Sequence, residues 1–288
     1  MIPEERRSKP RLISREDLQA LFRRYGLRPR KALGQHFLVS EPLLQKILEA
    51  ADLHPDDRVL EIGAGVGTLT FPLLERVARV LAVEADPRLC AVLEELAEGN
   101  PGLDLRCQDV LELDLPSLLH PPPWKVVANL PYYLSGPLLA RLLELHPLLR
   151  LAVLTLQKEV AERILSPPGK PSYGGLSVLS ALFAPARPVA PAPPRCFYPP
   201  PEVDSKVVRL DFLPSPQAPF SLLQKTVRAA FAHRRKSLRQ GLAKALGLPP
   251  DEIEDLLRAA QIDPSRRAEE MSPSEFLILA EALAGALK

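Results

Sequence analysis

The sequence predicts an α/β fold, in which helices cover both faces of a largely parallel sheet and a small all-α domain follows. Short apolar runs alternate with helical patterns of period 3.6 up to Leu165, as in chains built from βαβ units. After residue 219 only helical patterns remain. A chain of 288 residues is long enough for one α/β domain and one smaller domain.

A basic extension at residues 1–30 contains one helical pattern, from Ser14 to Tyr25, with Ser14 as its expected N-cap. Apolar runs predict strands at residues 59–62, 79–83, 103–107, 125–128, 151–156 and 207–212. Helical periodicity predicts helices at residues 43–51, 68–75, 88–97, 137–145 and 158–165. The Pro- and Gly-rich residues 166–175 are expected to form a loop.

A Pro-rich linker at residues 214–219 is predicted to separate the two domains. The α/β domain then covers residues 31–213, and the all-α domain covers residues 220–288. Four helical patterns in the second domain each carry an apolar face, the last of them through Phe276, Leu279 and Leu283.

Three glycines at alternate positions, Gly63, Gly65 and Gly67, follow the first strand of the sheet. Glycine lets the backbone turn tightly and approach a ligand closely. The spacing differs from the dinucleotide fingerprint, whose third glycine comes one residue later. The motif therefore predicts a ligand-binding turn of another kind, between a strand and a helix.

Acidic residues follow the next two predicted strands. Glu84 suits a ribose diol, because one carboxylate can accept from both hydroxyls. Asp109 can accept from an adenine amino group, and Val110 can pack on the adenine ring. Either acid alone is more often a solvated loop residue. Polar groups at successive strand ends point to a ligand, because open α/β sheets bind ligands there.

The segment Asn129-Leu130-Pro131-Tyr132 follows the apolar run at residues 125–128. The Asn129 amide oxygen and the Leu130 carbonyl can each accept one N–H of an exocyclic amine. The Tyr132 ring can stack on the base that carries this amine. Two such acceptors favour the nucleophilic form of an adenine N6 and gain strength as positive charge develops on it. The alternative is a loop stiffened by Pro131, with a tyrosine that only packs.

Five motifs occur in one order from about Lys31 to near the end of the chain: residues 33–38 (LGQHFL), 61–65 (EIGAG), 129–133 (NLPYY), 197–205 (FYPPPEVDS) and 231–238 (FAHRRKSL). With these motifs the chain resembles the ribosomal RNA adenine N6,N6-dimethyltransferase family of the small-subunit (16S) type. The resemblance implies a Rossmann-like, S-adenosyl-L-methionine-dependent methyltransferase sheet. It also implies dimethylation of two adjacent adenosines in the 3′-terminal hairpin loop of 16S rRNA, during biogenesis of the small ribosomal subunit.

The resemblance also assigns site residues. The catalytic positions are Asn129, Leu130, Pro131 and Tyr132. The cofactor positions are Gln35, His36, Leu38, Gly63, Gly65, Glu84, Asp109, Val110 and Asn129. Family members usually carry Asn where this chain has His36, so a backbone contact carries over more readily than a side-chain one. Phe197 is a second aromatic that could close the other face of the target base, with core packing as its alternative. Tyr133 receives no role, and neither a metal nor a strong general base is expected.

The net charge of +2 hides a strong local asymmetry. Residues 1–31 hold ten Lys or Arg and four acids, and residues 220–244 hold seven Lys or Arg and no acid. A run of one sign favours a polyanionic partner, here the small-subunit rRNA or the assembling subunit. The predicted RNA contacts are Lys225, Arg228, Arg234, Arg235, Lys236 and Arg239.

Composition favours a cytoplasmic enzyme, and a monomer is expected. No apolar run of transmembrane length and no signal-peptide pattern occur. Cys90, Cys107 and Cys196 are widely spaced and are expected to be reduced core residues. Two Asn and 33 Pro suit a thermophilic bacterium, although GC-rich coding produces a similar bias.

Two other functions compete with this interpretation. A large-subunit (23S) rRNA adenine N6-methyltransferase of the antibiotic-resistance type would share the catalytic core, but the motifs at residues 197–205 and 231–238 favour the small-subunit type. A non-catalytic RNA-binding assembly factor would not need a usable residue at every core cofactor position, and this chain has one at each.

Overall fold

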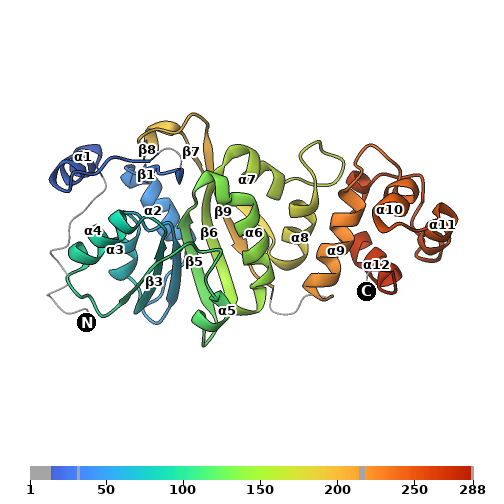
Figure 1. Cartoon of the computed structure of the whole chain (residues 1–288), viewed down its shortest axis with the longest axis horizontal. Helices are drawn as coiled ribbons and strands as arrows, with labels where there is room; N and C mark the ends of the chain where they lie inside the picture. The colour runs from blue at the N-terminus through green and yellow to red at the C-terminus, as the bar shows by residue number, and fades with distance from the viewer. Residues whose placement is uncertain (1–13, 31–32, 214–217, 287–288) are drawn as a thin grey trace. The chain divides into compact units, whose positions relative to one another are not determined.

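Seven strands form the main sheet of this computed structural model, which describes residues 14–30, 33–213 and 218–286 (Figure 1). In spatial order they are β4 (Leu103–Cys107), β3 (Arg79–Glu84), β2 (Arg58–Ile62), β5 (Trp124–Asn129), β6 (Leu149–Gln157), β9 (Ser205–Asp211) and β7 (Ala186–Ala192). The six strands predicted from apolar runs are confirmed. β7 was not predicted, because Pro188 and Pro191 interrupt its pattern, and such prolines are tolerated only at a sheet edge.

Strands β2 to β6 run parallel, and β9 runs antiparallel to β6 with Ser205 opposite Gln157. β2 pairs with β3 on one side and with β5 on the other, so the strand order reverses direction between β2 and β5. The carboxyl ends of parallel strands meet at one edge, and ligands of such sheets bind where the order reverses. This topology predicts a ligand site formed by the segments that follow Ile62, Glu84 and Asn129.

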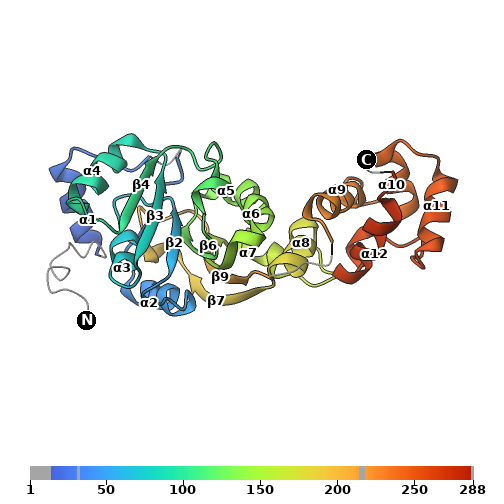
Figure 2. The same ribbon diagram turned by 90° about the horizontal axis from the view of Figure 1, so that it is seen from below.

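The described helices of the first half are α1 (Arg15–Arg24), α2 (Glu41–Ala50), α3 (Thr70–Leu74), α4 (Pro87–Ala97), α5 (Leu115–Leu118) and α6 (Ser135–Glu144). Ser14 caps α1 as predicted, because its hydroxyl accepts from the backbone N–H of Asp17 at 3.0 Å. α3 packs against β3, and α4 packs against β3 and β4 (Figure 2). Apolar side chains such as Val59 and Val80, both fully buried, fill the space between sheet and helices.

A two-stranded sheet joins two distant parts of the sequence. β1 (Phe37–Leu38) pairs antiparallel with β8 (Phe197–Tyr198), so that Phe37 lies opposite Tyr198 and Leu38 opposite Phe197. Neither strand was predicted, because two residues are too few to show alternation. The pairing brings the 33–38 and 197–205 motifs together.

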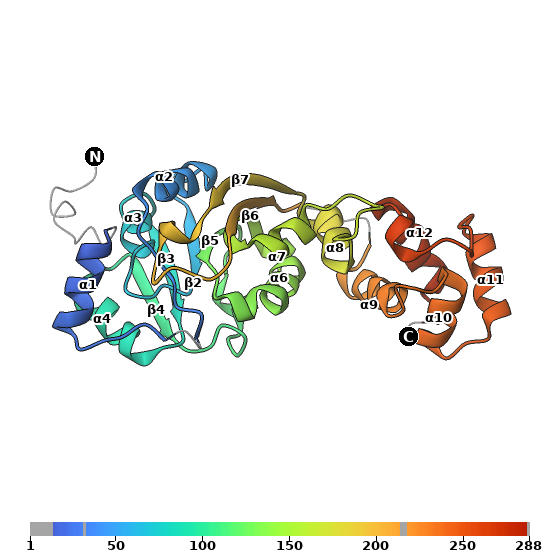
Figure 3. The same ribbon diagram turned by 90° about the horizontal axis from the view of Figure 1, so that it is seen from above.

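The described chain divides into two units (Figure 3). The sheet unit holds the residues up to Leu138, together with Leu148–Ala161 and Arg187–Asp211. The helical unit holds Leu139–Pro147, Glu162–Ala186 and the residues from Phe212 onward. The predicted linker at residues 214–219 lies partly outside the described residues. The helical unit includes two segments that precede this linker, Leu139–Pro147 and Glu162–Ala186, so its extent differs from that of the predicted all-α domain.

The helices from residue 158 onward are α7 (Lys158–Ile164), α8 (Gly175–Phe183), α9 (Phe220–Phe231), α10 (Leu238–Leu246), α11 (Pro250–Ala259) and α12 (Pro273–Leu283). The four predicted C-terminal helices are confirmed, and α8 is an addition that packs on α9 and α12. Phe231 and Phe276 stack in their core with ring centroids 5.7 Å apart. The Tyr173 hydroxyl donates to the carbonyl of Met271 at 2.8 Å and joins the loop before α8 to this core.

Cys90 on α4 and Cys107 at the end of β4 form a disulfide, with Cα atoms 6.0 Å apart. The expectation that both are reduced is therefore wrong for this pair, whereas Cys196 is free and buried. The sequence separation of 17 residues gave no sign that α4 returns beside β4. No helix in the described parts of the chain combines the length and apolar character needed to cross a membrane.

Candidate active site

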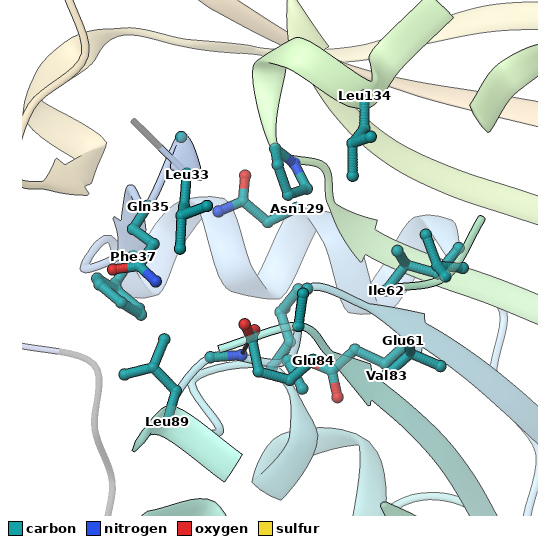
Figure 4. Close-up of a pocket in the computed structure, with 18 of the residues that line it drawn as sticks. Leu33, Gln35, Phe37, Glu61, Ile62, Val83, Glu84, Leu89, Asn129 and Leu134 are labelled. Atoms are coloured by element: carbon teal, nitrogen blue, oxygen red, sulfur yellow. Dashed lines mark hydrogen bonds between the residues drawn. The ribbon is translucent and has the colours of Figure 1, made fainter. Parts of the chain in front are cut away.

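A pocket lies at the carboxyl edge of the sheet, where β2, β3 and β5 end (Figure 4). Asn129, Glu84 and Gln35 border it from three different segments (Figure 4). The predicted residues that line it are Gln35, His36, Gly63, Gly65, Glu84, Asp109, Val110, Asn129 and Pro131. Nine of the site residues predicted from the sequence therefore line one cavity.

The glycine turn that follows β2 lines this pocket through Gly63 and Gly65. Gly63, Gly65 and Gly67 have φ values of 76°, 59° and 97°, in the left-handed region that favours glycine. A Cβ on Gly65 would lie 2.8 Å from Cε1 of Phe37, so the absence of a side chain also lets this ring pack on the turn. The turn therefore requires glycine for its backbone conformation and for close packing.

Glu84 is held by the backbone around it. Its Oε2 accepts from the N–H of Gly65 and its Oε1 from the N–H of Asp86, each at 2.8 Å. The side chain is buried, and burial raises the pKa of Glu84, while these two N–H donors oppose the rise. The carboxylate is therefore fixed at the end of β3, with its remaining lone pairs directed by the same two contacts.

Glu61, at the fourth position of β2, also lines the pocket, although sequence reasoning assigned it no role. The residue is 1% exposed, and neither carboxyl oxygen has a hydrogen-bond partner of good geometry among the described residues. Burial raises the pKa of Glu61 to about 8, the nearby Thr70 hydroxyl opposes the rise, and the Glu84 charge adds to it. The available signal was an acid inside an otherwise apolar strand that ends at the glycine turn.

Gln35 ties the segment before β1 to the end of β3. Its Nε2 donates to Asp86 at 3.0 Å, and its Oε1 accepts from the N–H of Arg30 at 2.7 Å. Arg88 also donates to Asp86, and together these contacts hold the pKa of Asp86 at about 2. Gln35 thus positions the segment that borders the pocket through an acid that stays ionised.

Asn129 ends β5 with its side chain oriented by a backbone group. Its Nδ2 donates to the carbonyl of His36 at 2.7 Å. No described residue donates to its amide oxygen. The backbone N–H of Leu130 donates to the carbonyl of Thr155 at 3.3 Å, and no hydrogen bond from a described residue reaches the Leu130 carbonyl. Two adjacent acceptors therefore have no donors among the described residues, and the first of them, Asn129, lines the pocket.

His36 and Tyr132 form a small polar cluster beside these acceptors. The His36 Nδ1 lies 2.7 Å from the carbonyl oxygen of Pro199, so this nitrogen carries the proton. The His36 and Tyr132 rings stack with centroids 5.3 Å apart. The Tyr132 hydroxyl lies 2.7 Å from the Ser205 hydroxyl. The His36 side chain therefore joins the 33–38, 129–133 and 197–205 motifs, a role that the sequence left open.

Four predicted residues do not border the pocket: Leu38, Leu130, Tyr132 and Phe197. Leu130 is buried, although its neighbours Asn129 and Pro131 both line the pocket. Leu38 and Phe197 are each 1% exposed and belong to the hydrophobic core, where they pair across β1 and β8. Phe197 therefore follows its alternative, core packing, because the β1–β8 pairing turns its ring inward. Tyr132 is half-buried next to the pocket without lining it. Asp109 lines the pocket, and its Oδ1 accepts from the N–H of Leu111 at 2.9 Å.

The acidic lining fits S-adenosyl-L-methionine, which combines a sulfonium and an ammonium charge with a ribose diol and an adenine. Glu61 supplies two buried oxygens without partners, and Glu84 supplies a fixed carboxylate. Buried acids without cationic partners favour a positively charged ligand. No cluster of three or more His, Cys, Asp or Glu suited to a metal occurs among the described residues.

The predicted RNA contacts lie on and between α9 and α10. Arg234, Arg235 and Lys236 occupy the turn between these helices. Arg234 donates to the carbonyls of Tyr173 and Pro171.

Arg239 pairs with Asp251 at 2.6 Å and with Glu254 at 2.8 Å. Arg234 and Arg239 are therefore engaged within the helical unit. The remaining predicted contacts, Lys225, Arg228, Arg235 and Lys236, are exposed.

Comparison with known proteins finds relatives that share one name. Ribosomal RNA small subunit methyltransferase A of Kineococcus radiotolerans is 41% identical, covering 93% of this chain and 91% of that protein. The protein of the same name from Syntrophotalea carbinolica is 44% identical, covering 89% and 97%.

Two solved structures also match. A dimethyladenosine transferase from Plasmodium falciparum has a TM-score of 0.76 at 28% identity and covers 87% of this chain and 98% of its own. The 23S rRNA methyltransferase ErmE has a TM-score of 0.66 at 27% identity, with coverages of 86% and 99%.

The family model described as ribosomal RNA adenine dimethylase matches residues 26–285, a span that includes all five motifs and every residue of the pocket described above. Together with relatives that are more than 40% identical over most of their length, this match shows that the chain belongs to the ribosomal RNA adenine dimethylase family, whose members are S-adenosyl-L-methionine-dependent methyltransferases.

Proposed function

We propose that this chain dimethylates the N6 atoms of two adjacent adenosines in the 3′-terminal hairpin loop of 16S rRNA, while the small ribosomal subunit is being assembled. The observation that carries the proposal is the pair of acceptors at the end of β5. The Asn129 amide oxygen and the Leu130 carbonyl have no donors from the described residues, and they stand beside a pocket whose acidic lining fits the cofactor.

The cofactor, when bound, supplies a methyl group on a sulfonium centre. Asn129 and Leu130 accept the two N–H groups of the target amine, and this favours the form of N6 whose lone pair points at the methyl group. The Asn129 side chain needs no rearrangement for this, because His36 already fixes its orientation. Positioning and preorganised acceptors then supply most of the rate acceleration, and the product amine loses its proton to water.

Tyr132 offers a ring for the target base. His36 covers one face of this ring, and the Ser205 hydroxyl fixes its edge. A target adenine would therefore stack on the other face. An adenine inside a helix cannot reach such a site, so the substrate has to be unpaired or flipped out, as in a hairpin loop.

The choice of the small subunit is supported by the relatives, which carry that activity in their names at 41% and 44% identity. The likeness to the 23S rRNA methyltransferase ErmE favours the large-subunit alternative, but at the lower identity of 27%. We further propose that the enzyme works in the cytoplasm as a monomer and takes a partly assembled small subunit as its partner.

Incubation with methyl-labelled cofactor and unmethylated small or large ribosomal subunits tests the proposal. Mass spectrometry of digested rRNA should detect N6,N6-dimethyladenosine at two adjacent positions of 16S rRNA, and none in 23S rRNA. Methylation of 23S rRNA instead would assign the large-subunit activity. Cofactor binding without methylation of either RNA would favour the non-catalytic assembly factor.

A further inference from the structure

A second hollow of the sheet unit has no place in the reaction described above. It is an open groove of about 610 Å³ between the start of α2, the start of α7 and the amino end of β9, here named the β9 groove. The lining residues that matter are Lys46, Lys158, Arg195, Asp204, Ser205 and Lys206. Four cations thus face the groove, against one carboxylate.

Three of the cations that line the β9 groove are available for a ligand. Lys46, Lys158 and Arg195 are exposed, and no hydrogen bond or ion pair of their side chains occurs among the described residues. This contrasts with Arg88 and Arg209, which pair with Asp86 and Asp211 at 2.6 Å. Unpaired cations around a concave surface create a positive potential that attracts polyanions.

The β9 groove is connected to the loop at residues 129–132, here named the catalytic loop, through the side chain of Ser205. Ser205 lines the groove, is 2% exposed, and lies within hydrogen-bond distance of the Tyr132 hydroxyl at 2.7 Å. The backbone N–H of Lys158 donates to the carbonyl of Asp204 at 2.9 Å, which fixes the start of α7 beside β9. A strand in the groove would therefore pass within one residue of the ring proposed to stack on the target base.

The polarity of the surface changes at one end of the groove. Arg195 also borders a smaller hollow whose other charged lining residues are Arg15, Glu16, Asp17 and Glu41. Its three carboxylates outnumber the two guanidinium groups, so this hollow is less favourable for phosphates than the β9 groove. An anionic strand that runs past Lys46 and Lys158 is therefore expected to turn away beyond Arg195.

We propose that the β9 groove binds the sugar–phosphate backbone of the RNA strand next to the target adenosine, with Lys46, Lys158 and Arg195 as phosphate contacts. The inference rests on the proposed function, because it takes the substrate to be an RNA strand. It assigns RNA binding to the sheet unit in addition to the cations of α9 and α10. Phosphate contacts of this kind fix the register of a strand without reading its sequence.

The test compares wild-type protein with the triple variant Lys46→Ala, Lys158→Ala, Arg195→Ala. All three side chains are exposed, so we expect the variant to fold and to bind the cofactor with unchanged affinity in calorimetry. Its affinity for unmethylated small subunits should fall roughly tenfold at moderate salt, and the log–log slope of affinity against salt should decrease by about 2, the value for three lost phosphate contacts.

Two further variants serve as controls. Lys46→Arg with Lys158→Arg retains the charges and should behave as wild type. Arg150→Ala removes an exposed cation at the start of β6, at the opposite edge of the sheet, and should leave the salt slope unchanged. In steady-state methylation the triple variant should raise KM, with kcat reduced less than threefold, because its residues do not touch the reacting atoms.

The outcomes separate the inference from the proposed function. If wild type methylates 16S rRNA but the triple variant keeps its KM and salt slope, the groove does not bind the RNA strand. Weaker binding of inorganic polyphosphate by the triple variant, with RNA affinity unchanged, would overturn the inference in favour of a small polyanion. If wild type methylates no rRNA at all, the proposed function fails first.

Discussion

The amide nitrogen of Asn129 lies 2.7 Å from the carbonyl oxygen of His36, so the catalytic loop and the segment that borders the cofactor pocket are hydrogen-bonded to each other. The Asn129 amide donates to the protein through its nitrogen, which leaves its oxygen for the acceptor role proposed above. In the proposed reaction, one side chain therefore links the cofactor pocket to the target amine.

Replacing Asn129 by Ala should lower the rate of methyl transfer by a factor of about 10² or more, the scale of losing one acceptor that acts in the transition state. Cofactor affinity should fall by only about 1 kcal/mol, because a single hydrogen bond to the His36 segment is lost. Single-turnover kinetics and calorimetry separate the two effects. Near-normal turnover by this variant would place the chemistry elsewhere.

Replacing Glu84 by Ala should weaken binding of S-adenosyl-L-methionine by about 1.5–3 kcal/mol, the range for hydrogen bonds to a charged group. Glu84 also accepts from the N–H of Gly65, so the thermal midpoint of each variant has to be measured beside its affinity. Glu84→Gln keeps one acceptor and should lose less affinity than Glu84→Ala. Equal affinity of all three proteins in calorimetry would place the ribose away from this residue.

Glu61 should make the stability of the free protein depend on pH. Its pKa is about 8 in the folded protein and 4.5 as the unperturbed value, so between these values the folded state holds a proton that the unfolded state has released. The contribution is complete below about pH 4.5 and is lost as the pH rises towards 8, by an amount on the order of 4 kcal/mol.

Denaturant unfolding of wild type and Glu61→Gln at pH 5 and pH 8 measures this contribution. The variant cannot ionise, so we expect it to gain stability relative to wild type at pH 8. A parallel decline of both proteins would show that Glu61 titrates normally. Calorimetry of cofactor binding in buffers of different ionisation enthalpy gives a second readout, because a cationic ligand should expel the Glu61 proton from wild type only.

In the helical unit, replacing Arg235 and Lys236 together by Ala should reduce the salt slope of RNA binding by about 1.5. Arg239→Ala is the matched control, since its side chain pairs with Asp251 and Glu254. That variant should lose less than about 1 kcal/mol of stability and leave the salt slope unchanged. A salt slope that responds to Arg239 alone would reverse the assignment of these cations.

Replacing Cys90 and Cys107 by Ser should lower the free energy of unfolding by about 3 kcal/mol, as expected for a bridge that closes a short loop. Denaturant unfolding with and without a thiol reductant checks this. Cys196→Ser, which removes the free buried thiol, should not change the response to reductant. If the double variant is as stable as wild type, the bridge contributes nothing under those conditions.

Local sequence patterns were sufficient to predict the strands and the turn that form the pocket. The apolar runs that end at Ile62 and Glu84 predicted β2 and β3, and the glycines predicted the turn between strand and helix. Because parallel strands end at one edge, these predictions also placed the acidic residues together. The edge strand β7 was missed because its prolines hide the alternation.

The sequence did not predict the contacts between residues that lie far apart along the chain. Which of Phe197 and Tyr198 faces the core depends on the register of β8 against β1. The turn between α9 and α10 contains no Gly or Pro, so nothing in the sequence marked where α9 ends. The burial of Glu61 and the approach of Cys90 to Cys107 are tertiary outcomes, and no spacing in the sequence encodes them.

The pairing of β1 with β8 has a consequence for any shortened form of the chain. A protein that begins after Ser40 would lose not only the pocket residues Gln35 and His36 but also the partner strand of Phe197. The backbone N–H and C=O groups of β8 would then face solvent next to a large aromatic ring. Such an unprotected edge is a template for pairing between molecules, so N-terminal trimming is expected to cause self-association as well as loss of cofactor binding.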